Sequence, residues 1–155
     1  MQVQLWIATP ADLPHLFEWM RQLRAADPME TESIVSRSTS ESAMVRLIDD
    51  SSAGRVWIVN VDGNAVGYVV LVFSFSVEFG GRTAFIDELL IDERFRGRGI
   101  GREVVDQVIE YARALGVQNL LLEVTESNLP ARRLYQSAGF LDRKYRLMSK
   151  WIGGQ

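Results

Sequence analysis

The segment ERFRGRGIGREVVDQVIEYARALG, residues 93–116, holds the densest group of residues that could do chemistry. Its first ten residues contain four arginines and three glycines, although the whole chain has 20 acidic and only 17 basic side chains. Glycine lets a backbone approach an anion closely, and a helix N-terminus attracts negative charge. This pattern predicts a phosphate-binding loop. The arginines are Arg94, Arg96, Arg98 and Arg102, and the glycines are Gly97, Gly99 and Gly101.

Two common phosphate-binding motifs do not fit this loop. The dinucleotide motif G-x-G-x-x-G would need a glycine where Arg102 stands, and no lysine followed by serine or threonine completes a nucleoside-triphosphatase loop. The pattern that fits is [R/Q]-x-x-G-x-[G/A], at residues 96–101. This hexapeptide resembles the acyl-CoA pyrophosphate loop of the GCN5-related N-acetyltransferase (GNAT) superfamily.

The resemblance extends over residues 85–140. LLIDERFRGRGIGREVV is similar to the strand, loop and helix of the family, and LLLEVTESNLPARRLYQSAGF is similar to its next strand and helix. The second segment carries the family pattern N-x-x-A-x-x-L-Y as Asn128, Ala131 and Tyr135, followed by GF. The resemblance implies a GNAT fold and an acetyl-CoA-dependent N-acetyltransferase without a metal. In such an enzyme a primary amine attacks the thioester directly within a ternary complex.

The resemblance also implies which residues bind CoA. Backbone groups of Leu89, Leu90 and Ile91 would pair with the pantetheine arm, and one N–H would polarise the acetyl carbonyl. The side chains of these three residues suit a core equally well. Asn128 matches a CoA-contacting position, and helix capping is its alternative. The predicted cofactor set is Leu89, Leu90, Ile91, Arg96, Gly97, Arg98, Gly99, Ile100, Gly101, Arg102 and Asn128.

Tyr135 is the candidate general acid. It matches the family tyrosine that protonates the leaving thiolate or hydrogen-bonds to the sulfur. Its alternative role is packing beside Leu134 on the same helix. The seven-residue offset from Asn128 favours the catalytic role.

A base is needed because amines have pKa values of about 10. Glu123 interrupts the apolar run LLLEV and matches the glutamate proposed as base in the branch that acetylates ribosomal-protein N-termini. A carboxylate inside a buried strand is costly, which supports a function for it. Asp87 and Glu88 lie where the polyamine-acetylating branch has an acidic pair, but strand alternation separates them unless a bulge intervenes. We rank Glu88 and Glu123 equally and Asp87 behind them, with an arginine ion pair as each one's alternative.

Composition limits the other possibilities. The chain has 155 residues, 47% hydrophobic, and a net charge of -3, which favours one domain over residues 1–155 and disfavours a nucleic-acid binder. It has no cysteine and one histidine, His15, which argues against disulfides and clustered metal ligands. No apolar run approaches the roughly 20 residues of a membrane span, and the N-terminal residues do not resemble a secretion signal. We expect a cytoplasmic protein with no membrane or nucleic-acid partner.

Hydrophobic periodicity predicts an α/β chain with the element order β-α-α-β-β-β-α-β-α-β. The helix at 99–115 has the clearest apolar stripe, and DGN at 62–64 predicts a hairpin. Residues 83–124 predict a parallel crossover, so we expect a mixed sheet flanked by helices. The expected strands are residues 2–8, 55–61, 65–75, 83–91 and 118–124, with one or two more in 140–152; the expected helices are 9–27, 36–50, 99–115 and 128–139.

The acceptor amine is not fixed by these motifs. Glu78, Asp87 and Glu88 favour a small amine or an amino-acid-like molecule over a protein N-terminus or a lysine. A rival hypothesis is an acyl-CoA-binding regulatory module without turnover, which Tyr135 and the carboxylates disfavour. An arginine–glycine RNA binder is disfavoured by the acidic chain. The apolar segment around Trp151 could serve a homodimer.

Overall fold

The computed structural model describes residues 1–27 and 35–154. Its centre is a five-stranded sheet with the strand order β1-β2-β3-β4-β5. No helix in the described parts of the chain has the length and apolar character needed to span a bilayer. The strands are β1 (Val3–Ile7), β2 (Gly54–Val61), β3 (Asn64–Ser76), β4 (Gly81–Ile91) and β5 (Asn119–Leu122). The helices are α1 (Leu13–Ala25), α2 (Arg37–Asp49), α3 (Ile100–Ala114) and α4 (Leu129–Ser137).

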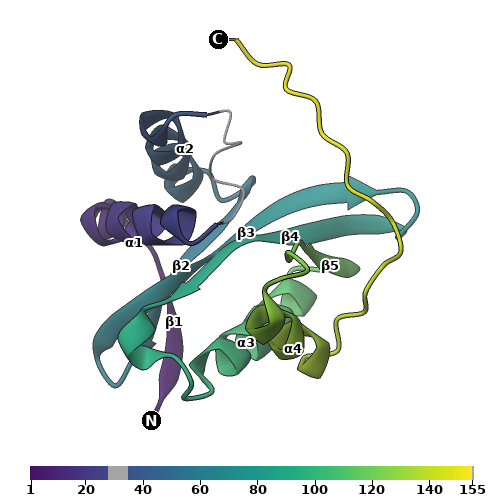
Figure 1. The fold of residues 1–155 in the computed structure, drawn as a ribbon. Coiled ribbons are helices and arrows are strands. Elements are labelled where there is room, and N and C mark those ends of the chain that lie inside the picture. The colour runs from purple at the N-terminus through teal and green to yellow at the C-terminus, as the bar shows by residue number, and fades with distance from the viewer. Residues whose placement is uncertain (28–34, 155) are drawn as a thin grey trace.

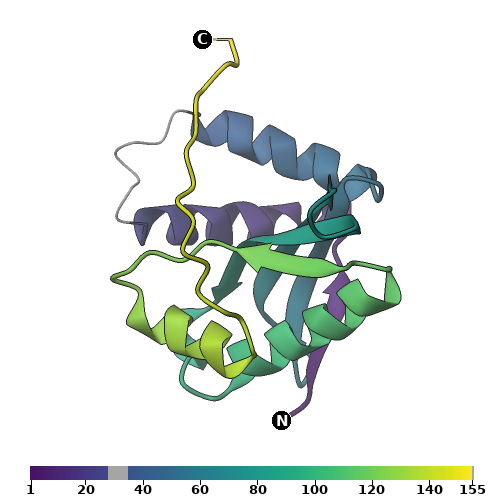
Figure 2. The ribbon, with the colours of Figure 1, turned by 90° about the vertical axis from the view of Figure 1, so that its right-hand side faces the viewer.

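The sheet is mixed, which confirms the predicted class. Strands β1 to β4 are antiparallel neighbours in sequence order, and β5 is parallel to β4. Helix α3 connects these two parallel strands, as the crossover prediction requires. Helices α1 and α2 cover one face of the sheet, and α3 and α4 lie on the other (Figures 1 and 2).

Each face of the sheet has its own hydrophobic core because side chains alternate along the strands. The apolar stripe predicted for α3 is buried on one face; its members are Ile100, Val104, Val108 and Ala112. On the other face, Leu16 and Trp19 of α1 and Met44 of α2 pack against Tyr68 and Leu90 of the sheet. Strand β4 is therefore held from both sides.

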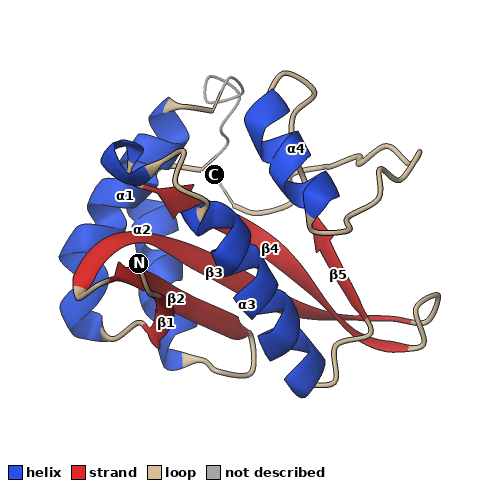
Figure 3. Ribbon diagram, turned by 90° about the horizontal axis from the view of Figure 1, so that it is seen from below, coloured by secondary structure: helices blue, strands red, loops and turns tan. Residues whose placement is uncertain are grey.

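A bulge interrupts β4 at Asp87. In the pairing of β3 with β4, Val70 lies opposite Glu88, while the next residue, Leu71, lies opposite Ile86. Asp87 is the extra residue, and such a bulge re-aims side chains and bends the strand. Figure 3 shows the long β4 beside the short β5, with α3 lying across the sheet.

The predicted closing strand is absent, because residues 138–154 contain no strand in the described structure. This segment runs as an extended chain past α4 and away from the sheet (Figure 1, yellow). Within this segment Arg143 donates to Glu78 at 3.3 Å and lies over the rings of Phe79 and Tyr145. The apolar residues within 140–152 suggested a strand, but a strand also needs a neighbouring strand with which to form hydrogen bonds. The homodimer contact through Trp151 stays a prediction.

Candidate active site

The loop before α3 has the backbone geometry that an anion site needs. Gly97 and Gly99 have φ values of 74° and 80°, in the left-handed region that suits glycine. Gly99 caps α3, and its carbonyl accepts the N–H groups of Arg102 and Glu103 at 3.1 and 3.2 Å. The N–H groups ahead of Arg102 lie in the first turn, where a helix supplies no partner of its own. The glycines therefore fit a phosphate held by backbone donors.

The arginine side chains brace this loop. Arg96 donates to the carbonyl of Ile91 at 2.8 Å, and Arg98 donates to the carbonyl of Arg94 at 3.2 Å. Arg94 itself donates to Asp92 at 2.7 Å, and the hydrogen bond between these side chains is the main reason that the pKa of Asp92 falls to about 2. In this arrangement the backbone N–H groups are the donors best placed for an anion.

Arg102 ties the loop to α4, the helix that carries Tyr135. Its Nη1 donates to the carbonyl of Ser137 at 2.6 Å and contacts the Ser137 hydroxyl at 3.1 Å. A Cβ on Gly101 would lie 3.3 Å from Cδ2 of Leu134, so the start of α3 and the middle of α4 are in close contact. The loop and Tyr135 therefore hold fixed positions relative to each other.

Strand β4 offers open backbone beside this loop. Its last pair with β5 joins Ile86 to Leu122, whereas β4 continues to Ile91. The edge of residues 87–91 that faces away from β3 thus runs past the end of β5. Leu90 is buried in the core under α1, and Leu89 packs against the core under α3. Core packing and the expected CoA binding are therefore compatible for these residues. The side chains fill the cores, while the backbone edge remains available for hydrogen bonds.

A cleft of about 1280 Å³ opens where β4 and β5 separate. Ligand pockets commonly have about 300–1,000 Å³, so this cleft has room for part of a donor and an acceptor together. The loop at 96–102 and the residues Leu90 and Ile91 lie outside its lining. The predicted site residues that line the cleft are Glu88, Leu89, Glu123, Asn128 and Tyr135.

The bulge brings both acidic residues of β4 to this cleft. Strand alternation would send the consecutive residues Asp87 and Glu88 to opposite faces, but with the bulge at Asp87 both line the cleft. Burial raises the pKa of each carboxyl above its ordinary value, and the charge of Asp87 raises the pKa of Glu88 further. Among the described residues, no three histidine or acidic side chains are arranged to hold a metal ion.

Glu88 is held by Tyr68, a residue that sequence reasoning missed. The Tyr68 hydroxyl donates to Oε2 of Glu88 at 2.8 Å, and this hydrogen bond opposes the rise in the pKa of Glu88. Tyr68 is fully buried, and its ring stacks on Trp19 of α1 with 6.1 Å between centroids. Its only sequence signal is a phenol within the apolar run of β3. The contact fixes one carboxylate oxygen and thereby orients the other.

Glu123 is placed differently from the prediction. Strand β5 ends at Leu122 and is only half-buried, and the exposed Glu123 follows it. The prediction that Glu123 lies inside a buried strand is therefore wrong. Glu123 nevertheless lines the cleft together with Asp87. Partial burial is the main cause that raises its pKa, and the charge of Asp87 adds to this. The two candidate bases therefore share one electrostatic environment.

Tyr135 lines the cleft from α4. Its ring meets the ring of Phe140 edge-on, with 5.8 Å between centroids, and burial raises its pKa. A raised pKa keeps the phenol protonated near neutral pH, as a proton donor requires. Asn128 caps the same helix by accepting the N–H of Ala131 at 3.2 Å, so its capping alternative is present.

Comparisons with known proteins agree with this geometry. The sequence profile of the Acetyltransferase (GNAT) family matches residues 15–140. A thialysine N-epsilon-acetyltransferase of Bos taurus is 34% identical over 77 residues, which cover 50% of this chain and 45% of that enzyme. A glucosamine 6-phosphate N-acetyltransferase of Oryza sativa is 24% identical over 133 residues, covering 83% of this chain and 74% of that enzyme. The chain thus spans less than half of the length of the bovine relative.

Solved structures share the fold at low sequence identity. A possible acetyltransferase from Clostridium difficile 630 has a TM-score of 0.81 at 17% identity, covering 99% of this chain and all of that one. An aminoglycoside N-acetyltransferase in complex with CoA has a TM-score of 0.78 at 14% identity, covering 98% of this chain and 96% of that one. The glycine loop, the open edge of β4 and the profile match over most of the chain converge on one result: this protein is a member of the GNAT acetyltransferase family, whose acyl donor is acetyl-CoA.

Proposed function

We propose that this protein transfers the acetyl group of acetyl-CoA to a primary amine of a small acceptor, by direct attack within a ternary complex. The observation that carries this proposal is a single cleft lined by Tyr135, by Glu88 and Glu123, and by Leu89 at the open edge of β4. It offers a proton donor and proton acceptors beside the segment expected to hold the thioester. No residue of the chain needs to form a covalent intermediate.

The chain's own groups would hold the donor in two places. Backbone N–H groups at Gly99 to Gly101 would bind the pyrophosphate at the N-terminus of α3. The backbone edge of Leu89 to Ile91 would pair with the pantetheine arm, and one of its N–H groups would polarise the thioester carbonyl. The donor supplies an activated acetyl group with a thiolate as the leaving group.

The acidic side chains would remove the proton that the attacking amine must lose. Glu88 is the better placed of the two candidates, because Tyr68 fixes one of its oxygens and leaves the other for the amine or a water. Glu123 is the alternative, and the charge of Asp87 raises the pKa of both carboxyls. The new C–N bond forms as the C–S bond breaks, and the phenol of Tyr135 would give its proton to the departing sulfur.

A screen of acceptor classes tests the proposal. The purified protein is incubated with acetyl-CoA and, separately, with polyamines, amino acids, aminoglycosides and peptide amines, while free CoA is detected. We expect acceptor-dependent release of CoA with at least one class, together with an acetylated product in mass spectrometry. Tight binding of acetyl-CoA without turnover in every class would instead support the regulatory module.

The phosphate loop gives a separate prediction about binding. We expect Gly99→Ala to weaken acetyl-CoA binding about 10-fold, because φ of 80° costs an alanine roughly 1–2 kcal/mol and the loop must turn its N–H groups to relieve it. No described atom lies within 4 Å of a Cβ at this position, so a clash does not contribute. Calorimetric titration with acetyl-CoA measures the affinity.

Gly116→Ala is the matched control for this substitution. Gly116 follows the other end of α3 with φ of 74° and equally open surroundings. It should carry the same backbone strain without a loss of affinity, and thermal unfolding should show similar stability for the two variants. Unchanged affinity in a folded Gly99→Ala protein would remove the loop from the phosphate site.

A further inference from the structure

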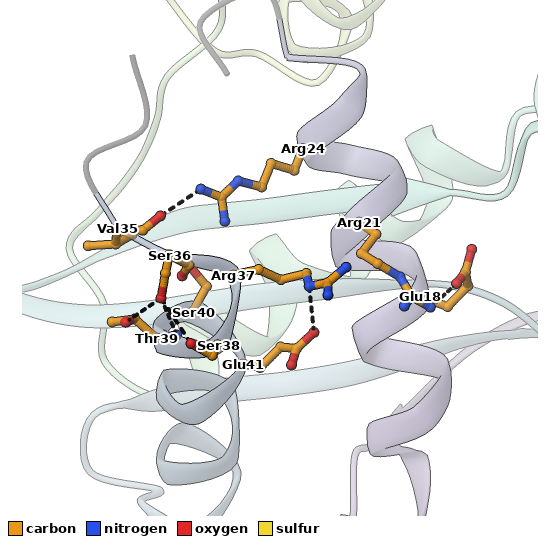
Figure 4. A network of polar contacts seen from close by, with 10 residues as sticks. All are labelled: Glu18, Arg21, Arg24, Val35, Ser36, Arg37, Ser38, Thr39, Ser40 and Glu41. Carbon is orange, nitrogen blue, oxygen red and sulfur yellow. Dashed lines mark hydrogen bonds and ion pairs between the residues drawn. The ribbon is translucent and has the colours of Figure 1, made fainter. Parts of the chain in front are cut away.

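Three of the arginines that line the cleft come from α1 and α2, and the phosphate loop lies outside the lining. Arg21 and Arg24 belong to the C-terminal half of α1, and Arg37 is the first residue of α2. Figure 4 shows the guanidinium of Arg37 extending from α2 toward α1, where Arg21 lies. None of these residues has a part in the proposed acetyl transfer.

The contacts of Arg21 and Arg37 leave hydrogen-bonding capacity. Arg21 pairs with Glu18 one turn earlier, and Arg37 approaches Glu41 only to 3.8 Å. Both ion pairs are exposed, with 47% of the Arg21 side chain and 63% of the Arg37 side chain accessible. Exposed pairs of this kind contribute little and exchange readily, and a guanidinium has five N–H donors. Arg24 is more fixed, since it donates to the carbonyl of Val35 at 2.6 Å.

The arginines and the carboxylates are connected by a short structural path. Glu88 bonds to Tyr68, and Tyr68 stacks on Trp19 of α1. Arg24 is five residues beyond Trp19, which corresponds to about 7.5 Å along the helix axis. The same cleft is therefore lined by Asp87 and Glu88 of the sheet and by the three arginines of α1 and α2; Glu41 of α2 and Asp27 also line it.

We propose that the acceptor is an amine that also carries an anionic group, either a carboxylate or a phosphate monoester. This inference rests on the proposed acetyl transfer. Arg37 and Arg21 bind the anionic group through charge-assisted hydrogen bonds, and the amine faces Glu88. The N-terminus of α2 adds little, because the Ser36 hydroxyl already caps it by accepting the N–H of Thr39 at 3.2 Å. A plain polyamine would place its second ammonium against the arginines, where like charges repel.

Matched acceptors that differ only in the anionic group test this proposal. Lysine is compared with cadaverine, and glucosamine 6-phosphate with glucosamine, by the rate of CoA release from acetyl-CoA. We expect kcat/KM to be at least about 10-fold higher for the anionic member of one pair. The pair that responds distinguishes carboxylate from phosphate. Equal or better use of both members that lack the anionic group would overturn the proposal.

Arginine variants then locate the anionic group. The preference is the ratio of the two kcat/KM values in the responding pair. Arg37→Gln and Arg21→Gln should each lower it toward 1, by about 10-fold. Arg113→Gln is the matched control, because Arg113 pairs with Glu110 at the same i,i+3 spacing on α3, away from the cleft. An unchanged preference in both cleft variants would show that the arginines do not bind the acceptor.

A binding measurement separates this inference from the proposed reaction. If none of the four acceptors releases CoA, each is titrated by calorimetry into the protein saturated with CoA. Tighter binding of one anionic member, weakened by Arg37→Gln, would uphold the anion site while refuting acetyl transfer to these amines. Equal binding of the members with and without the anionic group would refute the anion site itself.

Discussion

Tyr135→Phe is expected to bind acetyl-CoA as the parent protein does and to turn over 10²–10⁴-fold more slowly, the range typical of losing a general acid. The substitution removes one hydroxyl and keeps the ring, so the edge-on contact with Phe140 survives. Because burial raises the pKa of Tyr135, the parent phenol is protonated across the working pH range and can donate to the departing sulfur. Steady-state release of CoA gives kcat, and calorimetry gives the affinity for acetyl-CoA.

Tyr111→Phe is the control for this prediction. Tyr111 lies on α3, where its ring meets the edge of Trp57, and it does not line the cleft. It should keep the parent rate. A Tyr135→Phe protein with the parent rate would make Tyr135 a packing residue of α4. A variant that lost affinity as strongly as rate would indicate a binding role.

The sequence predicted the elements that depend on local patterns. The stripe of α3, from Ile100 to Ala112, recurs at helical spacing, and the glycines before it mark the loop by their conformational needs. The crossover followed from the handedness and order of strands. These features make up the half of the candidate site that is expected to bind CoA, so that expectation could be stated from the residues alone.

The half of the candidate site that is expected to hold the acceptor depends on contacts between distant residues. The bulge at Asp87 is visible only in the register of β4 against β3, because an alternating pattern does not mark which residue is extra. Tyr68 and Glu88 are 20 residues apart, and only their cross-strand approach joins them. The prediction of a strand within 140–152 was wrong for a related reason. The local pattern does not reveal whether the edge of another strand is available for pairing. The features that the sequence did not reveal are therefore those that depend on pairing between distant segments.

Glu88→Gln is expected to lower kcat/KM by 10²–10⁴-fold with acetyl-CoA affinity retained, if Glu88 is the base. Glutamine keeps the size of the side chain and an oxygen that can accept the Tyr68 hydroxyl, so the variant should fold. Glu123→Gln should lose much less, because Glu123 is exposed and no residue in the described ranges fixes its orientation as Tyr68 fixes that of Glu88. Glu110→Gln on α3, outside the cleft, controls for the loss of one negative charge.

The pH dependence of the rate distinguishes Glu88 from Glu123 independently of these losses. The base must be ionised, so kcat/KM should fall as pH is lowered through its pKa, and burial places the pKa of Glu88 above the ordinary value of about 4.3. The Tyr68 hydrogen bond lowers that pKa. Tyr68→Phe should therefore move the acid limb of the profile to higher pH while preserving most of the rate on the alkaline side.

The same variant tests the alternative assignment. Losing the Tyr68 hydrogen bond should cost about 1–3 kcal/mol of stability, which thermal unfolding measures, so profiles are recorded well below the melting temperature. With Glu123 as the base, Tyr68→Phe would leave the acid limb in place and Glu123→Gln would carry the large loss, since Tyr68 contacts Glu88. Full activity in both glutamine variants would mean that the amine arrives neutral or loses its proton to water, and neither carboxylate would be the base.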